Sequence, residues 1–543
     1  MPKDETVATA LVEALRELGV RYVFGVPSGG WVDYMEALRV AEGIEFILTT
    51  HEGGAGMMAD VCGRLTGRPG VCFGTFGPGA TNLATGVGEA LLDRSPMIAF
   101  TDEMPAAMRG RTSQMAIDHQ ALFRPLTKKT TRLTADAVKS VLFDAARVAL
   151  EGRPGPVHVG LPVGLSAERA SEENVRFRAP PAPPAADAES LAKAATLFAK
   201  ARKPIIAVGL GAVHAKAQAE VQAIAEKHKI PVVLTPMAKG MLAEDHPCYA
   251  GVLFHALSDI VGETHGQADL VLAVGYDPVE FNYESWMPER AQLVSFDLEP
   301  ADIDRATYDG AAEAIGDIKH SLQTILALAP IAHDWDLAAL ARRRSAMFEK
   351  LKPSNRGFGP KAALAVLREM LPEDGIMTCD VGAHTHLIGQ VWRTPAPGLQ
   401  IMTNGWSTMG FGIPAAIAAK LISPEKSVCS VVGDGGFLMT AGELATAVRY
   451  RVNIVVLVLS DNDLALIRIK QQKKGNPIYG TAVRESGAIG GPDIFGVPVR
   501  VARDALELRK HLAEAFTAGS PVIVEAIVDS REYDGVVLKK DKP

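Results

Sequence analysis

The chain has 543 residues, of which 48% are hydrophobic, and its formal net charge is −7. This length predicts about three domains of typical size. The acidic balance gives no general attraction to nucleic acid or to an anionic membrane surface, so we expect neither as a partner. No apolar run approaches the roughly 18 residues of a transmembrane helix, and the first residues lack the apolar core of a signal peptide. A soluble, cytoplasmic protein is therefore expected.

The five cysteines are odd in number and lack CxxC spacing. That pattern predicts structural thiols in a reducing compartment rather than disulfides or a zinc site.

The first part of the chain, residues 1–178, has the pattern of a parallel α/β domain. Residues 6–18 carry apolar side chains at helical spacing, and Gly19 follows them. Apolar runs of strand length recur at 20–24, 46–50, 71–75, 96–100 and 157–161. Strands that alternate with loops and helices in this way predict a parallel sheet.

A proline-rich stretch, residues 179–186, marks the clearest boundary in the chain. A second α/β unit, residues 188–341, follows it. Gly209 and Gly211 supply only part of a dinucleotide fingerprint, so a plain strand-to-helix turn is favoured there. The charged helical stretch 334–352 and Pro353 form a second boundary, and the third α/β unit covers residues 355–543.

The third unit contains the motif around which the chain is organised. An apolar run, 427–432, ends in Gly433-Asp434-Gly435-Gly436, and the next run, 453–459, leads to Asp461 and Asp463. Asp434 and Asp461 are about one βαβ unit apart, so both should lie at the carboxyl ends of neighbouring parallel strands, where ligands bind. Carboxylates beside a glycine turn suit Mg²⁺ holding a diphosphate.

These motifs resemble the thiamine-diphosphate (ThDP) dependent decarboxylase and carboligase family. The resemblance extends over nearly the whole chain and implies three doubly wound parallel-sheet domains. The first would bind the pyrimidine, the second is the central domain, and the third would bind the diphosphate. The side chains of Asp434 and Asp461, with the backbone carbonyl of Asp463, would ligate Mg²⁺. Glu52, which follows His51 after a strand, matches the family's activating glutamate.

The resemblance also assigns further cofactor contacts. The Ser407 backbone would contact the aminopyrimidine, and Met409 stands where the family places a bulky apolar residue between the two rings. The diphosphate would be held by Gly382, His384, Gly433, Gly435 and Gly436.

The activity implied by the family is decarboxylation of a 2-oxo acid. Glu52 would hydrogen-bond the aminopyrimidine and so promote loss of the thiazolium C2 proton, which makes the cofactor a nucleophile. The segment 114–128 resembles the catabolic, flavin-independent acetolactate synthases, so pyruvate is the expected donor, a carbonyl compound the acceptor, and FAD is not expected. Gln114 would face the substrate. A homodimer or homotetramer is implied, in which Glu52 meets Asp434 of a second subunit.

Several positions depart from that subfamily and leave the substrate open. Phe76 stands where a hydroxyl is common, and the first glycine loop carries no lysine. The candidate substrate-pocket residues are Ser28, Gly29, Trp31, Phe76, Leu464 and Ile467. A non-ligating 2-oxo acid decarboxylase and a benzaldehyde-lyase-like carboligase for larger substrates therefore stay as alternatives. A non-catalytic ThDP-fold subunit and a nicotinamide-linked oxidoreductase are the alternatives from other classes.

Some side chains allow two interpretations. Trp31 and Phe76 could also be ordinary core residues, and His119 is expected in a loop or at the surface. The cations Arg109, Arg111, Arg468 and Lys470 are either solvated or reach an acidic group of the substrate.

Overall fold

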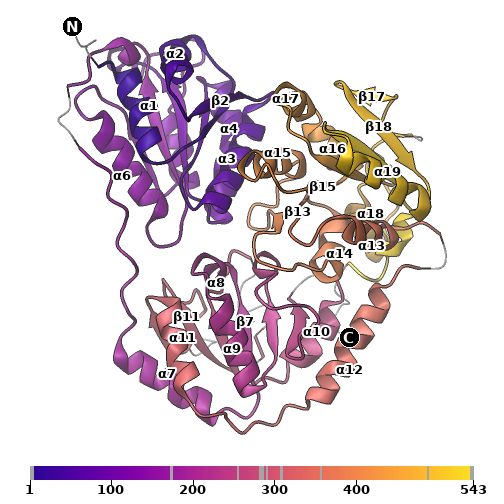
Figure 1. Cartoon of the computed structure of the whole chain (residues 1–543). Coiled ribbons are helices and arrows are strands. Elements are labelled where there is room, and N and C mark those ends of the chain that lie inside the picture. Colours follow the sequence, from indigo (N-terminus) through magenta and orange to yellow (C-terminus); the bar gives the residue numbers. More distant parts are fainter. Residues whose placement is uncertain are drawn as a thin grey trace.

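The computed structural model describes residues 5–171, 175–253, 256–280, 287–288, 291–305, 310–354, 357–485 and 488–537. Each of three regions builds one sheet of six or seven strands, and Figure 1 shows the three regions around a common centre. The predicted α/β class with three parallel sheets is confirmed. Within the described ranges, no helix is long and apolar enough to cross a membrane.

The first sheet has the order β2-β1-β3-β4-β6-β5, and all of its neighbouring strands are parallel. Its strands are β1 (Tyr22–Gly25), β2 (Glu45–Leu48), β3 (Gly70–Gly74), β4 (Met97–Glu103), β5 (Lys129–Arg132) and β6 (Pro156–Pro162). The helices of this region are α1 (Val7–Glu17), α2 (Val32–Val40), α3 (Glu52–Thr66), α4 (Pro78–Leu92), α5 (His119–Phe123) and α6 (Val138–Leu150).

The second sheet has the order β12-β11-β10-β7-β8-β9 and is also parallel. Its strands are β7 (Pro204–Val208), β8 (Val232–Leu234), β9 (Tyr249–Val252), β10 (Leu270–Val274), β11 (Gln292–Asp297) and β12 (Gly310–Ile315). The helices of this region are α7 (Ala188–Lys200), α8 (Leu210–His214), α9 (Gln218–His228), α10 (Ser258–His265), α11 (Ile318–Ala327) and α12 (Leu337–Leu351).

The third sheet has the order β14-β13-β15-β16-β19-β18-β17, and only the short edge strand β17 is antiparallel to its neighbour. Its strands are β13 (Ile376–Cys379), β14 (Gln400–Met402), β15 (Val428–Gly433), β16 (Val455–Ser460), β17 (Asp493–Ile494), β18 (Val497–Ala502) and β19 (Val522–Ile527). The helices of this region are α13 (Pro360–Met370), α14 (Ala383–Val391), α15 (Gly412–Ile422), α16 (Asp434–Thr440), α17 (Glu443–Arg449), α18 (Ala465–Lys473) and α19 (Ala505–Thr517).

The first and third regions share a hydrophobic core within the chain. One buried cluster joins Ala55 and Met58 of α3 to Ile413 and Ile417 of α15, and these two helices lie side by side in Figure 1. Helix α3 tolerates this approach because much of its surface is glycine, alanine and methionine. The shared core fixes the N-terminus of α3, where Glu52 stands, against the third region. All five cysteines are free and buried, as predicted.

Candidate active site

The paired strands β15 and β16 bring the two predicted metal-binding aspartates together. Gly433 is in register with Leu459, so Asp434 and Asp461 follow at the same edge of the sheet. The backbone N–H of Asn462 donates to Asp434 Oδ2 at 2.6 Å, and that of Gly435 to Asp434 Oδ1 at 2.9 Å. The N–H of Asp463 donates to Asp461 Oδ1 at 3.1 Å. These bonds hold both carboxylates at one sheet edge.

The electrostatics of this pair favour a cation. Burial, and then the negative charge of Asp434, raise the pKa of Asp461 to about 7. Burial also raises the pKa of Asp434. Two buried carboxylates that oppose each other's ionisation are relieved by a bound cation, and carboxylate oxygens are the ligands that Mg²⁺ prefers.

The side chain of Asp463 has another partner. Its carboxylate pairs with Arg468 Nε at 2.9 Å, and Arg468 also reaches Asp534 at 3.4 Å. Arg468 therefore ties the metal loop to the C-terminal segment, which argues against the open possibility that it binds a substrate. Lys470 is exposed on the same helix, α18.

A cavity of about 120 Å³ lies beside these carboxylates. Its walls include Asp434, Asp461 and Asp463, and they contain most of the predicted cofactor residues: Gly382, His384, Met409, Gly433, Gly435 and Gly436. Leu464 and Ile467, which we assigned to the substrate pocket, line the same cavity, as does Tyr533, which the sequence did not indicate. No described first-region residue lines it.

His384 offers a polar atom to this cavity. The side chain is 4% exposed, and burial lowers its pKa to about 4, so the imidazole is neutral. In the described part of the chain, His384 Nε2 has no hydrogen-bond partner. A buried nitrogen of this kind needs a partner, and a ligand can supply it.

Asp380 joins two of the predicted cofactor loops. Its Oδ1 accepts hydrogen bonds from the N–H groups of Val381 at 2.7 Å and Gly410 at 2.8 Å. A Cβ atom at Gly436 would lie 1.9 Å from Asp380 Oδ2, so only glycine fits there. Beside Gly410, Met409 is half-buried and Ser407 is exposed with its Oγ donating to Asn404 O at 2.8 Å.

Glu52 lies in the first region, where α3 begins just beyond β2. The side chain is 8% exposed, and Asn82 Nδ2 donates to Glu52 Oε2 at 3.0 Å. His51 caps the helix by accepting from the Gly53 N–H at 3.0 Å, which makes it a positioning residue for its neighbour. A Cβ atom at Gly79 would lie 3.2 Å from Glu52 Oε1, so the glycine loop after β3 packs on the carboxylate.

Glu443 of α17 is a supporting residue that the sequence analysis missed. It is 1% exposed and accepts hydrogen bonds at 3.1 Å from the N–H groups of Thr50 and His51. The segment before Glu52 is therefore held by a carboxylate from the third region. Only the folded contact identifies this role, because Glu443 sits in an ordinary amphipathic helix.

The predicted substrate-pocket residues of the first region separate into two groups. Ser28 hydrogen-bonds Asp102, to which Thr75 Oγ1 also donates at 3.1 Å, and burial raises the pKa of Asp102 to about 6. A Cβ atom at Gly29 would meet open space. Phe76 is half-buried. These residues stay candidates for a substrate pocket.

Trp31 does not belong to that group. Its side chain is 0% exposed and stacks on Phe73 with ring centroids 4.0 Å apart, inside the core of the first region. The prediction that Trp31 lines a substrate pocket is therefore wrong, because the indole completes an aromatic cluster with Tyr34 and Phe100.

His119 is also placed differently from expectation. It is 3% exposed, and its Nε2 accepts from the Gly77 N–H at 3.3 Å while Nδ1 bonds Thr101 Oγ1 at 2.9 Å. His119 thus holds the glycine loop by a hydrogen bond to Gly77 and is buried rather than at the surface. Gln114, in the loop before it, is exposed in the single chain.

Comparison with known proteins agrees with this geometry. Residues 5–122 match the thiamine pyrophosphate enzyme N-terminal TPP binding domain, residues 191–325 the central domain, and residues 380–526 the C-terminal TPP binding domain. Acetolactate synthase of Bacillus subtilis is 32% identical and covers 98% of this chain and 95% of its own length. The chain belongs to the thiamine pyrophosphate enzyme family.

Other members of the family are similar over the same length. A probable acetolactate synthase large subunit of Methanocaldococcus jannaschii is 31% identical, with 97% of this chain and 92% of the relative covered. The acetolactate synthase isozyme 1 large subunit of Escherichia coli is 29% identical, with 98% and 95% covered. The first and third regions are thus TPP-binding domains, and the chain is a TPP-dependent, acetolactate-synthase-like enzyme.

Proposed function

We propose that this enzyme uses ThDP and Mg²⁺ to decarboxylate a 2-oxo acid, with pyruvate as the expected donor, and to join the remaining acyl unit to a carbonyl acceptor. The observation that carries the proposal is the third-domain cavity, where Asp434, Asp461 and the unpartnered Nε2 of His384 meet the glycine loops. The relatives named acetolactate synthase support a two-pyruvate reaction that gives 2-acetolactate.

The residues present suit the cofactor. Asp434 and Asp461, with the Asp463 carbonyl, would hold Mg²⁺, since the carboxylate of Asp463 is already engaged by Arg468. Backbone N–H groups at the starts of α14 and α16 and the His384 imidazole would bind the diphosphate. The cavity wall formed by Met409 and Leu464 is apolar and suits the rings.

Bound ThDP would supply the nucleophilic carbon and the electron sink for decarboxylation. Glu52 would hold a proton at the aminopyrimidine, with Oε1 directed to the ring because Asn82 already occupies Oε2. Glu443 and His51 fix the backbone on which Glu52 stands. The glycine loop at Gly79 packs against the same carboxylate and excludes water from it.

A complete site would need two subunits. The diphosphate cavity is lined by third-domain residues in the described part of the chain, whereas Glu52 belongs to the first domain. We propose that Glu52 of one subunit faces the cavity of another, which requires a homodimer or a homotetramer.

We also propose that the enzyme works without flavin, as the catabolic synthases do. A cavity of about 320 Å³ lies at the carboxyl edge of the central sheet, where a nucleotide would bind. Arg94 and Arg153 of the first domain enter it and form ion pairs with Asp277 and Asp297. These ion pairs compensate the charges at the cavity, and the proposal itself follows from the resemblance of segment 114–128 to the catabolic synthases.

A second reaction stays in consideration because of Phe76. Phe76 is half-buried in the glycine loop that contacts Glu52. A phenyl ring at this position makes the first-domain side of the site more apolar than a residue with a hydroxyl group would. A benzaldehyde-lyase-like carboligase for larger substrates, or a 2-oxo acid decarboxylase without ligation, would use such a wall. Aldehyde without 2-acetolactate from pyruvate would favour these reactions.

The direct test is Glu52→Gln, with Glu45→Gln on the exposed end of β2 as the control. Loss of the proton-holding carboxylate should lower turnover of pyruvate by about 10²- to 10⁴-fold while ThDP and Mg²⁺ still bind. Product formation is followed by mass spectrometry and cofactor binding by isothermal titration. Full turnover in Glu52→Gln, or no ThDP binding by the unmodified protein, would contradict the proposal.

A further inference from the structure

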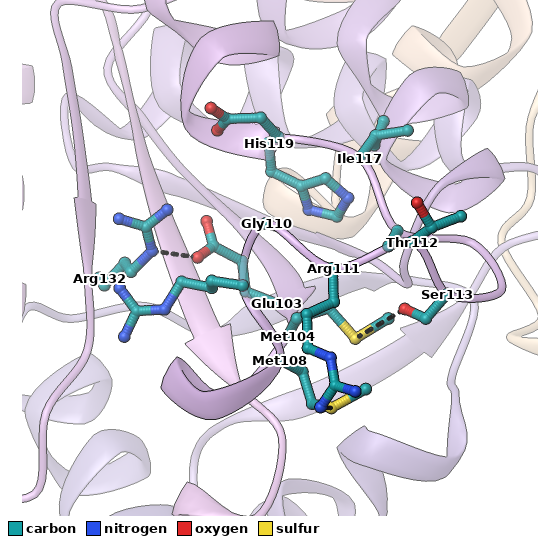
Figure 2. A pocket seen from close by; sticks show the side chains of 13 residues that line it. Glu103, Met104, Met108, Gly110, Arg111, Thr112, Ser113, Ile117, His119 and Arg132 are labelled. Carbon is teal, nitrogen blue, oxygen red and sulfur yellow. Dashed lines mark hydrogen bonds and ion pairs between the residues drawn. The ribbon is translucent and has the colours of Figure 1, made fainter.

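A third and larger cavity lies in the first domain at the carboxyl end of β4. Its volume is about 490 Å³, and its charged and titratable lining residues are Glu103, Arg109, Arg111, Asp118, His119 and Arg132. Figure 2 shows the Arg132–Glu103 pair on one side and Arg111 beside Met108 on another. The loop that follows β4 forms most of its wall.

The two carboxylates of this cavity are already engaged. Glu103 pairs with Arg132 and accepts a hydrogen bond from Gln120 Nε2 at 2.6 Å. Asp118 caps α5 by accepting from the Ala121 N–H at 3.0 Å. Glu103 and Arg132 therefore compensate each other, and Asp118 offsets one of the two remaining cations of the cavity, which leaves an excess of positive charge.

Arg109 and Arg111 are those remaining cations. Both are exposed, and within the described residues neither forms an ion pair; Arg111 has a weak contact with Met108 Sδ at 3.8 Å. Burial lowers the pKa of His119, so its imidazole adds no positive charge. Two guanidinium groups that line the cavity and form no ion pair within the described residues make it a site for an anion, since guanidinium groups bind carboxylates and phosphates bidentately.

The cavity connects to the proposed active site through a single loop. His119 lines the cavity and holds the Gly77 N–H. A Cβ atom at Gly77 would lie 2.9 Å from Met115 O, so the cavity loop also packs directly on the glycine loop. Two residues farther along, Gly79 packs on Glu52. Residues 77–79 thus contact both the loop that lines the cavity and the carboxylate of Glu52.

We propose that this cavity binds an anionic group of a substrate, at the end remote from the reacting carbonyl. The inference rests on the proposed function and narrows its substrate class to 2-oxo acids or aldehydes that carry a second acid group, such as a carboxylate, sulfonate or phosphonate. Arg109 and Arg111 determine this specificity. The same chemistry fits the donor or the acceptor, and the experiment separates the two.

The test uses the full-length holoenzyme with matched substrate pairs. As donors we compare 2-oxoglutarate with 2-oxopentanoate, and as acceptors with pyruvate we compare succinic semialdehyde with butanal. Within each pair the chain length is equal and only the distal charge differs. The variant is Arg109→Gln/Arg111→Gln, and the control is Arg124→Gln, an exposed arginine of the same segment outside the cavity.

The unmodified enzyme should prefer the acidic member of one pair, and the double variant should lose about 10- to 100-fold in kcat/KM for that member only. The pair in which the loss occurs identifies donor or acceptor. Arg124→Gln should behave like the unmodified enzyme. No preference in either pair, or a preference that survives the double variant, would overturn the inference.

A binding measurement makes the result independent of turnover. Isothermal titration of the holoenzyme with glutarate and with pentanoate should show glutarate bound at least tenfold more tightly, and the double variant should remove the difference. Equal binding of both acids would overturn the inference. Failure of the proposed function looks different, because Glu52→Gln would then keep full turnover of the substrates that lack a distal acid group.

Discussion

Glu89 carries a buried carboxyl group at the joint between the first and third domains. It is 0% exposed on α4 and lies beside Asp60 and Asp93, while Thr408 of the third domain is its neighbour. Arg64 forms ion pairs with both aspartates. Burial, and then the charges of Asp60 and Asp93, raise the pKa of Glu89 well above its ordinary range.

A protonated Glu89 makes stability depend on pH. Because its pKa in the folded protein is above the ordinary value of 4.5, its contribution is fully present below that value and is lost as pH rises toward the folded-state pKa. The slope is about 1.4 kcal/mol of unfolding free energy per pH unit. Glu89→Gln, which keeps the shape of the neutral acid, should gain stability relative to the unmodified protein with increasing pH. Urea unfolding between pH 5 and 8 measures this.

An exposed residue supplies the control for Glu89. Glu42→Gln, in the turn before β2, should leave the pH dependence unchanged, since that side chain is exposed. Parallel pH profiles for the unmodified protein and Glu89→Gln would mean that Glu89 is ionised in the folded state.

Individual residues show where the sequence was sufficient and where it was not. Asp434 and Asp461 were predicted to lie together because their spacing within one βαβ unit fixes their position. Trp31 and His119 were misjudged because their environments come from strands far along the chain. Trp31 stacks on Phe73 of β3, and His119 bonds Thr101 of β4. Sequence spacing carries no information about such contacts.

At the scale of elements, three edge strands that were not predicted, β5, β9 and β12, have weak patterns. β5 is Lys-Thr-Thr-Arg at a sheet edge, with little apolar character. β9 and β12 are rich in alanine and glycine and are also edge strands. Their positions are set by pairing with a buried neighbour, which local propensity cannot show. Central strands such as β15 and β16 were predicted because strands buried on both faces have uninterrupted apolar runs.

Helix α17 holds the backbone just before Glu52 at the start of α3, through Glu443. Glu443→Ala would remove the buried carboxylate that accepts hydrogen bonds from the N–H groups of Thr50 and His51. The expected loss is about 2 kcal/mol of unfolding free energy, because hydrogen bonds to a charged acceptor contribute about that much. Turnover should fall as well, because the backbone that carries Glu52 loosens. Urea unfolding and steady-state kinetics measure the two effects.

Glu425→Ala, in the exposed turn before β15, is the matched control for Glu443→Ala. It removes the same side chain without a buried contact and should change neither stability nor turnover. A Glu443→Ala enzyme with unmodified stability and kinetics would show that the joint does not support the site.

At the scale of the whole molecule, the proposed active site consists of two halves, the first-domain part with Glu52 and the third-domain cavity with Asp434. The shared core of α3 and α15 joins the first and third domains of one chain, but in the described residues the diphosphate cavity contains no first-domain wall. Under the proposed function, a complete site would assemble between subunits, each contributing the half that the other lacks. The sequence already predicted Glu52 in the first domain and Asp434 in the third, and the folded chain places the described cavity wall in the third domain alone.

The most direct test combines two inactive variants. Glu52→Gln and Asp434→Ala should each be inactive alone. Co-expressed with different affinity tags and purified through both, they should regain about a quarter to a half of the unmodified activity, because one site in each mixed pair contains neither substitution. If the mixed oligomers stay as inactive as the parents although both variants assemble, Glu52 and Asp434 act within one chain and the account is contradicted.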